Sequence, residues 1–113
     1  TLFNKGLQYR DYIYIDDVIS ACLKILIKPQ SGVFNLCSEK SYNFVEIIKI
    51  IKNILKTKYK TISHSKVFFK INNEDLYNRN FIGSSLLFKK KFLWKNKTNF
   101  KNGIIKVINQ IKV

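Results

Sequence analysis

The sequence predicts an α/β fold, because short strand-like runs and longer helix-like runs alternate along its 113 residues. Residues 12–15 alternate between apolar and amphipathic β-formers, which is typical of a half-buried strand, and the predicted strand covers 11–15. Residues 17–28 and 44–57 carry apolar side chains at helical spacing. Two or three short strands make a poor sheet by themselves, so we expect further strands from residues outside this sequence.

The first part of the chain is predicted to contain a loop, a strand, a helix and a second strand, over residues 1–9, 11–15, 17–28 and 33–37. Gly6 is the expected turn residue of the loop. Asp16 and Asp17 lie where the helix should begin, and their carboxylates can accept its free backbone N–H groups and complement its dipole. Pro29 ends this helix.

The second part is predicted to contain a helix, a short strand and two further helices, over residues 44–57, 66–71, 86–92 and 103–111. Asn43 precedes the first of these helices and Glu46 follows three residues later, which is the pattern of a capping box. Ser84 and Ser85 are candidate caps for the next helix, and Asn99 is a candidate cap for the last.

The composition indicates a globular protein, with 46% apolar and 25% charged residues. The longest apolar run is cut by Lys24 and Lys28, so no membrane span is expected. Cys22 and Cys37 have no CxxC spacing and are interpreted as buried thiols in a reducing compartment, which favours a cytoplasmic protein. The sequence begins at Thr1 and has no methionine, so we expect a segment of a longer gene product.

The net charge of +14 is unevenly distributed. Residues 1–47 have a net charge of zero, and residues 48–113 hold sixteen bases and two acids. Such asymmetry can mark a nucleic-acid surface, and stacking aromatics are available in the same part. These aromatics are Phe68, Phe69, Phe88 and Trp94. Their strand and helix patterns are explained by core packing, and spread lysines usually form a solvated face. A basic module for nucleic acid or an acidic partner therefore remains the alternative, and nucleic acid is not the expected partner.

Four segments resemble, in order and spacing, the NAD-dependent epimerase/dehydratase family, the extended short-chain dehydrogenases that act on nucleotide sugars. They are RDYIYIDDVISACLKIL, GVFNLCSEKSYNFVEIIKII, FIGSSLLFKKKFLW and TNFKNGIIKVI. The resemblance implies the C-terminal portion of a Rossmann-like NAD(P)-binding fold with the small substrate-binding subdomain, few short strands and about four helices. It makes residues 1–113 a single incomplete domain that lacks the N-terminal NAD-binding part.

The family's cofactor and catalytic motifs are missing from this sequence. No G-x-x-G-x-x-G phosphate loop occurs, and no tyrosine is followed four residues later by lysine. In the intact family that tyrosine is the acid/base and the lysine lowers its pKa. The resemblance therefore implies no catalytic, cofactor-binding or metal-binding residue here, and NAD(P) is expected in the intact family but not on this chain alone. His64, the only histidine, is interpreted as a surface residue.

The resemblance assigns nucleotide-sugar binding to this chain, with Arg10 as the main residue. Arg10 matches the family arginine that binds the diphosphate, and a guanidinium pairs with phosphate in fork geometry. The alternative for Arg10 is an ion pair with one of the nearby acids, Asp11, Asp16 or Asp17.

Two weaker assignments follow from the same resemblance. Asn43, or Ser41 beside it, matches a loop position that contacts the nucleotide in some relatives, and a plain helix cap is the alternative. Arg79 matches a second phosphate arginine only loosely. Family glycines are replaced at Cys37 and Leu93, which leaves the scaffold intact and weakens any assignment of a particular sugar.

The sequence therefore predicts a fragment of an NAD-dependent nucleotide-sugar epimerase/dehydratase that contributes nucleotide-sugar binding and is inactive alone. The expected partners are a nucleotide-diphosphate sugar and a missing N-terminal half or a second copy of the chain. Epimerase, dehydratase and reductase chemistry all remain open, as does the identity of the sugar.

Overall fold

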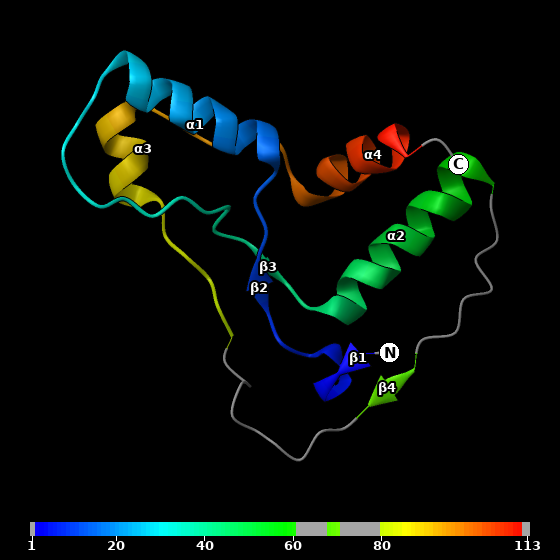
Figure 1. Ribbon diagram of the computed structural model, residues 1–113. Helices are drawn as coiled ribbons and strands as arrows, with labels where there is room; N and C mark the ends of the chain where they lie inside the picture. The colour runs from blue at the N-terminus through cyan, green and yellow to red at the C-terminus, as the bar shows by residue number, and fades with distance from the viewer. Residues whose placement is uncertain (1, 61–67, 71–79, 112–113) are drawn as a thin grey trace. The chain divides into compact units, whose positions relative to one another are not determined.

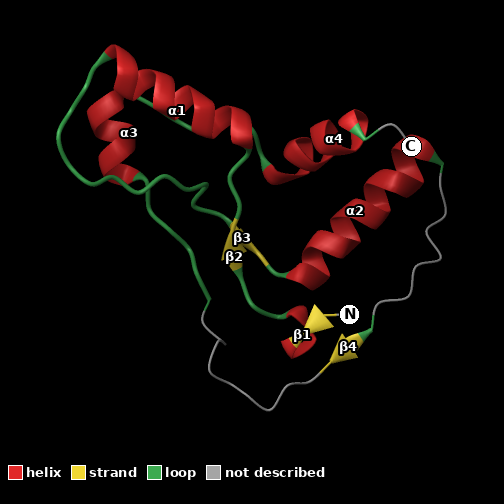
Figure 2. Ribbon diagram, in the orientation of Figure 1, coloured by secondary structure: helices red, strands yellow, loops and turns green. Residues whose placement is uncertain are grey.

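The computed structural model describes residues 2–60, 68–70 and 80–111 (Figure 1). Within these ranges the chain forms four α-helices, one 3₁₀ turn and four two-residue strands (Figure 2). In order they are β1 (Leu2–Phe3), η1 (Asn4–Gly6), β2 (Arg10–Asp11), α1 (Ile15–Ile27), β3 (Ser41–Tyr42), α2 (Phe44–Tyr59), β4 (Phe69–Lys70), α3 (Leu86–Phe92) and α4 (Phe100–Gln110). The predicted fold class, α/β with few short strands and about four helices, is confirmed.

The chain divides into two compact units, which are described separately. Unit 1 contains Thr1–Arg10 and Tyr42–Phe81, and unit 2 contains Asp11–Ser41 and Ile82–Val113. The single incomplete domain that the sequence predicts over residues 1–113 stays a prediction.

The strands are shorter than the sequence predicts. β1 pairs with β4 in parallel, with Leu2 opposite Phe69, and β2 pairs with β3. The predicted strand over 11–15 is wrong beyond Asp11, because the chain enters α1 at Ile15. The predicted strand over 33–37 is also wrong, since the described residues offer it no pairing strand. Two predicted elements lie partly outside the described residues, namely the strand over 66–71 and the loop that contains Arg79.

Unit 1 is built around α2, whose start is sealed by local hydrogen bonds. The Asn43 side chain accepts the Glu46 N–H at 2.9 Å, and the Glu46 carboxylate accepts the Asn43 N–H at 3.0 Å. The predicted capping box is therefore confirmed. Ile54 on the predicted apolar stripe is buried, and Lys60 ends the helix in the left-handed conformation at φ 53°.

Unit 2 has an aromatic core. Phe88 and Phe92 of α3 stack with ring centroids 4.5 Å apart, and Trp94 meets Phe88 edge-on at 5.4 Å. Ala21 of α1 is fully buried in the same cluster, and Phe34 packs against it from the irregular segment that the sequence predicts as a strand. Such edge-to-face and stacked pairs stabilise beyond the area they bury. Two of the four aromatics considered for base stacking are thus core residues.

Asp17 holds a distant loop instead of capping its own helix, so the predicted capping role is wrong. Its two carboxylate oxygens accept the N–H groups of Lys97 and Thr98 at 2.9 and 3.0 Å. Helix α1 begins after Tyr14, whose side chain makes no capping bond. The carboxylate is buried, which it tolerates because charge-assisted hydrogen bonds replace water. Tertiary structure therefore uses a residue that local rules assign to the helix start.

A second set of polar bonds fastens the 37–39 segment to the start of α3. Ser85 Oγ accepts the Cys37 N–H at 2.7 Å and donates to the Cys37 carbonyl at 3.0 Å. Its own N–H donates to Glu39 at 2.8 Å, and Lys89 binds the same carboxylate at 2.6 Å. The Lys89 ammonium and the Ser85 N–H hold the pKa of Glu39 below its usual value. Ser85 therefore precedes α3 without capping it by its side chain.

Two positions, one after α3 and one shortly before it, have special steric features. α3 matches its predicted range and is followed by Leu93 in the left-handed region at φ 49°, where the related family has glycine. A Cβ on Gly83 would lie 2.7 Å from the buried Cys37 Sγ, so only glycine fits there without a shift.

Cys22, predicted to be buried, is exposed on α1, and both cysteines are free. α4 begins at Phe100, earlier than predicted, with Asn99 as its confirmed cap.

Candidate functional site

The guanidinium of Arg10 is held by its own loop. Nη1 donates to the Tyr9 carbonyl at 2.9 Å, and Nη2 donates to the Gln8 side-chain oxygen at 2.9 Å. These two bonds orient the guanidinium relative to its own loop. The side chain is half-buried, and Arg10 is the first residue of β2, directly after the loop. A half-buried, oriented guanidinium is suited to hold a phosphate, because its fork geometry matches two phosphate oxygens.

Tyr9 connects this loop to the rest of unit 1. Its backbone N–H donates to the Asn80 side chain at 3.0 Å, and its carbonyl accepts the Phe81 N–H at 3.0 Å. Its hydroxyl lies 3.4 Å from the Glu46 carboxylate, at the long end for a hydrogen bond. The segment at residues 80–81 and the start of α2 are therefore both fixed relative to the residue that precedes Arg10.

Asn43 lies at the start of α2 and is mostly buried, with 7% of its surface exposed. Its side-chain oxygen is used by the capping box with Glu46. The cap that the sequence offers as the alternative role is thus present in the structure. Glu46 connects Asn43 with Tyr9, the residue before Arg10. It accepts the Asn43 N–H and lies within the longer contact of the Tyr9 hydroxyl. A nucleotide contact by Asn43 stays a prediction.

The acids considered as alternative partners of Arg10 each hold another group. Asp11 accepts the N–H groups of Ser38 and Glu39 at 2.7 and 2.9 Å. Asp16 binds Lys106 at 3.1 Å, which raises the pKa of that lysine, and Asp17 holds the 97–98 loop. These contacts give each acid a structural role of its own.

The structure brings Arg10 and Asn43 into one unit, and it does not place the third predicted residue. Arg79 and His64 lie outside the described residues. Sequence reasoning missed Tyr9 and Asn80 as residues that fix the site. The available signals were weak: Tyr9 directly precedes Arg10, and Asn80 belongs to a polar loop next to Arg79.

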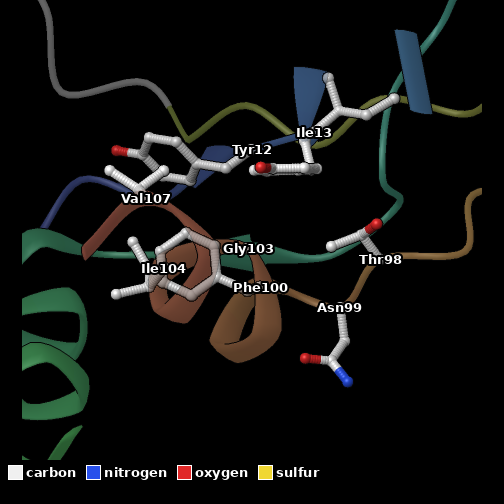
Figure 3. Close-up of a pocket in the computed structure, with 9 residues that line it drawn as sticks. Tyr12, Ile13, Thr98, Asn99, Phe100, Gly103, Ile104 and Val107 are labelled. Atoms are coloured by element: carbon white, nitrogen blue, oxygen red, sulfur yellow. The ribbon is translucent and has the colours of Figure 1, made fainter. Parts of the chain in front are cut away.

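Unit 2 contains an apolar cavity of about 170 Å³ between the segment before α1 and helix α4 (Figure 3). It is lined mainly by Tyr12, Ile13, Phe100, Ile104 and Val107. The Tyr12 and Phe100 rings lie 5.6 Å apart. With so few polar groups, this cavity suits an apolar group and is a poor site for a phosphate.

The described residues hold no cluster of three or more histidine, cysteine or acidic side chains that could bind a metal ion. None of the helices in the described ranges has the length and apolar character needed to cross a membrane.

Comparisons with known proteins relate this geometry to a family of enzymes. Residues 1–37 match the sequence model of the NAD dependent epimerase/dehydratase family. A comparison with curated proteins gives no match. Solved structures match over nearly the whole chain. The ADP-L-glycero-D-manno-heptose-6-epimerase of Helicobacter pylori is 25% identical, with a TM-score of 0.78 over 96% of this chain and 32% of that one. The predicted family resemblance is confirmed.

Two further epimerase/dehydratase structures agree with this result. The UDP-glucose 4-epimerase of Thermotoga maritima is 23% identical, with a TM-score of 0.78 over 96% of this chain and 34% of that one. The dTDP-glucose 4,6-dehydratase of Bacillus anthracis is 25% identical, with a TM-score of 0.74 over 96% and 32%. The chain has the fold of the C-terminal portion of these Rossmann-like enzymes and spans about a third of their length.

Proposed function

We propose that this chain supplies the nucleotide-sugar-binding part of an NAD-dependent epimerase/dehydratase, with Arg10 as the residue that holds the diphosphate. The observation that carries the proposal is the orientation of the Arg10 guanidinium by two uncharged acceptors of its own loop. The charge is thus presented in a fixed direction at little further entropic cost to binding. Asn43 and Arg79 are proposed as secondary contacts to the nucleotide and to a phosphate.

The relatives support this substrate class. The Thermotoga maritima structure was determined with UDP-glucose, and the structure of WbmG from Bordetella bronchiseptica was determined with NAD and UDP. A UDP or dTDP sugar has a diphosphate of the kind that an oriented guanidinium recognises. Which sugar this chain prefers depends on residues beyond the two that the structure brings together.

The cofactor belongs to another part of the enzyme. The chain has no glycine-rich loop of the Rossmann type, so its residues do not fit NAD(P). In the intact enzymes the bound cofactor supplies hydride chemistry. Without the tyrosine and lysine of the family, this chain is proposed to bind substrate without converting it, inside the cytoplasm.

A titration with UDP-glucose and dTDP-glucose tests the role of Arg10. Hydrogen bonds to charged groups contribute roughly 1.5–3 kcal/mol, so Arg10→Ala should weaken binding by roughly 10- to 150-fold. Arg10→Lys should lie between, because it keeps the charge and loses the fork. Lys49→Ala is the matched control, since it removes one exposed positive charge from α2 of the same unit.

Equal affinity of Arg10→Ala and Lys49→Ala for both nucleotide sugars would show that the diphosphate is held elsewhere. Epimerase or dehydratase turnover by the chain alone would contradict the proposal that it is inactive by itself.

A further inference from the structure

Another hollow of unit 2, of about 500 Å³, lies between the segment that follows α1 and helix α3 (Figure 1). Its volume is within the range of roughly 300–1,000 Å³ that is usual for small-molecule sites. The residues that line it are Ser31, Gly32, Phe34, Leu87, Lys90 and Lys91. None of them belongs to the proposed diphosphate site, whose residues are all in unit 1. The proposed function therefore leaves this hollow without a role.

One wall of the hollow is a face of α3. Leu87, Lys90 and Lys91 are spaced by three and four residues, so they lie on the same side of the helix. Phe88 and Phe92 leave α3 on another side and form the aromatic core. All three wall residues are exposed, and Leu87 has 69% of its surface exposed. The helix thus presents one apolar and two basic side chains to the hollow.

The other wall is a turn that rests on Phe34. Gly32 has a φ of +141°, which residues with a side chain rarely adopt, and a Cβ on it would lie 3.0 Å from the tip of the Phe34 ring. Phe34 packs edge-on against Phe88 and Phe92, with ring centroids 6.1 and 5.3 Å apart. The turn is therefore supported directly by the aromatic core, and this support gives the hollow an apolar part of defined shape.

The described lining has two positive charges and no acid, because Lys90 and Lys91 are its only charged residues. The third lysine of α3, Lys89, is paired with Glu39 at 2.6 Å. Lysines in the last turn of a helix complement its dipole, but that end of the dipole is equivalent to only roughly half a negative charge. Two further lysines exceed what the helix end compensates. An anion in the hollow would compensate both of them.

We propose that this hollow binds a small phosphate monoester that carries an apolar or aromatic group. A phosphate monoester has a charge of roughly −1.5 to −2 at pH 7, which matches two ammonium groups. The Ser31 hydroxyl lines the same hollow and can donate to a phosphate oxygen. Phe34 and Leu87 provide apolar surface for the other end of the ligand. Neither a bare phosphate nor a neutral aromatic molecule uses both parts.

Glycine labelling makes binding in this hollow measurable. The chain has four glycines, so ¹⁵N-glycine gives four backbone amide signals in a nuclear magnetic resonance spectrum. Gly32 lines the hollow and is the only glycine that follows a serine, so serine labelled with ¹³C at its carbonyl identifies the Gly32 signal. The titrant is 1-naphthyl phosphate. Inorganic phosphate and 1-naphthol are titrated separately, because each carries only one of the two chemical parts.

1-Naphthyl phosphate should shift the Gly32 signal with a Kd of roughly 1 mM or below, which is the ligand efficiency of a drug-sized molecule applied to about 15 non-hydrogen atoms. Inorganic phosphate and 1-naphthol should each bind at least roughly tenfold more weakly, since each loses the contacts of one part. The signals of Gly83 and Gly103, which belong to unit 2 and do not line the hollow, should stay in place and show that the unit is folded.

Lysine variants test the basic part of the hollow. Lys90→Gln and Lys91→Gln keep most of the side-chain length and remove the charge. Each should weaken 1-naphthyl phosphate roughly threefold, and the double variant roughly tenfold. Lys101→Gln is the matched control, because it removes an exposed charge from α4 of the same unit, outside the hollow. It should leave the affinity unchanged.

Leucine variants test the apolar part. Leu87→Gln should weaken 1-naphthyl phosphate roughly threefold and leave inorganic phosphate unchanged, because it removes apolar contact and no charge. Leu86→Gln is the matched control, since Leu86 is 54% exposed on the same helix and does not line the hollow. It should leave both affinities unchanged.

An unmoved Gly32 signal at roughly ten times the expected Kd would overturn the proposal. Equal binding of 1-naphthol would overturn it as well, because the surface would then be purely apolar, and equal binding of inorganic phosphate would show a simple anion contact. An equal loss of affinity in Lys101→Gln would show attraction to the net charge of the chain instead of to this hollow.

The hollow and the proposed diphosphate site fail separately, because they belong to different units. Gly6 lies in η1 of unit 1, four residues before Arg10. A shift of the Gly6 signal without a shift of Gly32 would place the phosphate near Arg10 and reject the hollow. Conversely, the Lys90 and Lys91 variants should leave the affinity for UDP-glucose at Arg10 unchanged.

Discussion

The acidic residues at the starts of α1 and α2 are used differently. Both helices have free N–H groups in their first turn, and both carry acidic residues there. At α2, Asn43 and Glu46 satisfy each other within four residues. At α1, the carboxylate of Asp17 leaves its own helix and binds a loop 80 residues further along the chain. One start is a local structure, and the other is a tertiary contact.

This difference shows what an acidic residue at a helix start can be used for. A capping box stabilises its helix even before the rest of the fold forms. Asp17 gains its hydrogen bonds only once the 94–98 segment is in place, so it couples α1 to that segment. Ser20 strengthens the same coupling, because its hydroxyl accepts the Trp94 indole N–H at 2.8 Å.

Asp17→Ala should have the largest effect on stability. The substitution removes the buried acceptor of two part-buried backbone N–H groups, which costs roughly 2–4 kcal/mol of unfolding free energy. Urea unfolding followed by the fluorescence of Trp94 measures it, since Trp94 is the only tryptophan and is buried in unit 2. Asp16→Ala removes an exposed carboxylate from the same turn and should leave the transition almost unchanged. Equal effects of the two variants would contradict the coupling.

Leu93→Gly should increase the free energy of unfolding by roughly 1–2 kcal/mol. The left-handed conformation is sterically unfavourable for leucine, which has a Cβ, and is readily adopted by glycine. Leu93 is 87% exposed, so little burial is lost. Leu87→Gly is the opposite control: Leu87 is exposed inside α3, where glycine costs about 1 kcal/mol. Thermal unfolding should move up for the first variant and down for the second. A fall in both would mean that Leu93 makes a contribution beyond its backbone.

Asn43→Ala should have the smallest effect, about 1 kcal/mol, which is the usual cost of losing a cap. Asn43→Ser keeps an acceptor and should recover most of it. Far-ultraviolet circular dichroism during urea unfolding detects the change in α2. The same pair of variants tests the proposed nucleotide contact: if Asn43 is only a cap, Asn43→Ser binds UDP-glucose as well as the original chain. Weaker binding by the serine variant would assign Asn43 to the substrate.

Local patterns predicted the elements whose stabilising contacts are local. The range of α3, the capping box at Asn43 and the cap at Asn99 follow from hydrogen bonds within a few residues. The strand over 33–37 failed because strand pairing needs a partner from elsewhere in the chain, which no local pattern contains. The predicted burial of Cys22 was wrong for a related reason. Its apolar spacing predicts burial, and the layer that would bury it is not formed by the described residues.

The candidate site was predicted only as far as its chemistry is local. A lone arginine before a strand predicts a phosphate contact and the resemblance predicts that it binds a diphosphate, and both stay predictions. The sequence does not show that Tyr9 joins the Arg10 loop to Asn80 and Glu46, because these contacts cross 71 and 37 residues. Such long-range polar bonds depend on the fold being known first.

The close approach of Gly83 to Cys37 has a consequence for how this sequence can change over time. A methyl group on residue 83 would meet the sulfur at 2.7 Å and the Cβ of Cys37 at 2.9 Å. The related family has glycine at the position of Cys37, which would leave room for a larger residue 83. The two positions share one small volume, so enlargement at one requires reduction at the other. Substitutions at 37 and 83 should therefore be inherited as a pair.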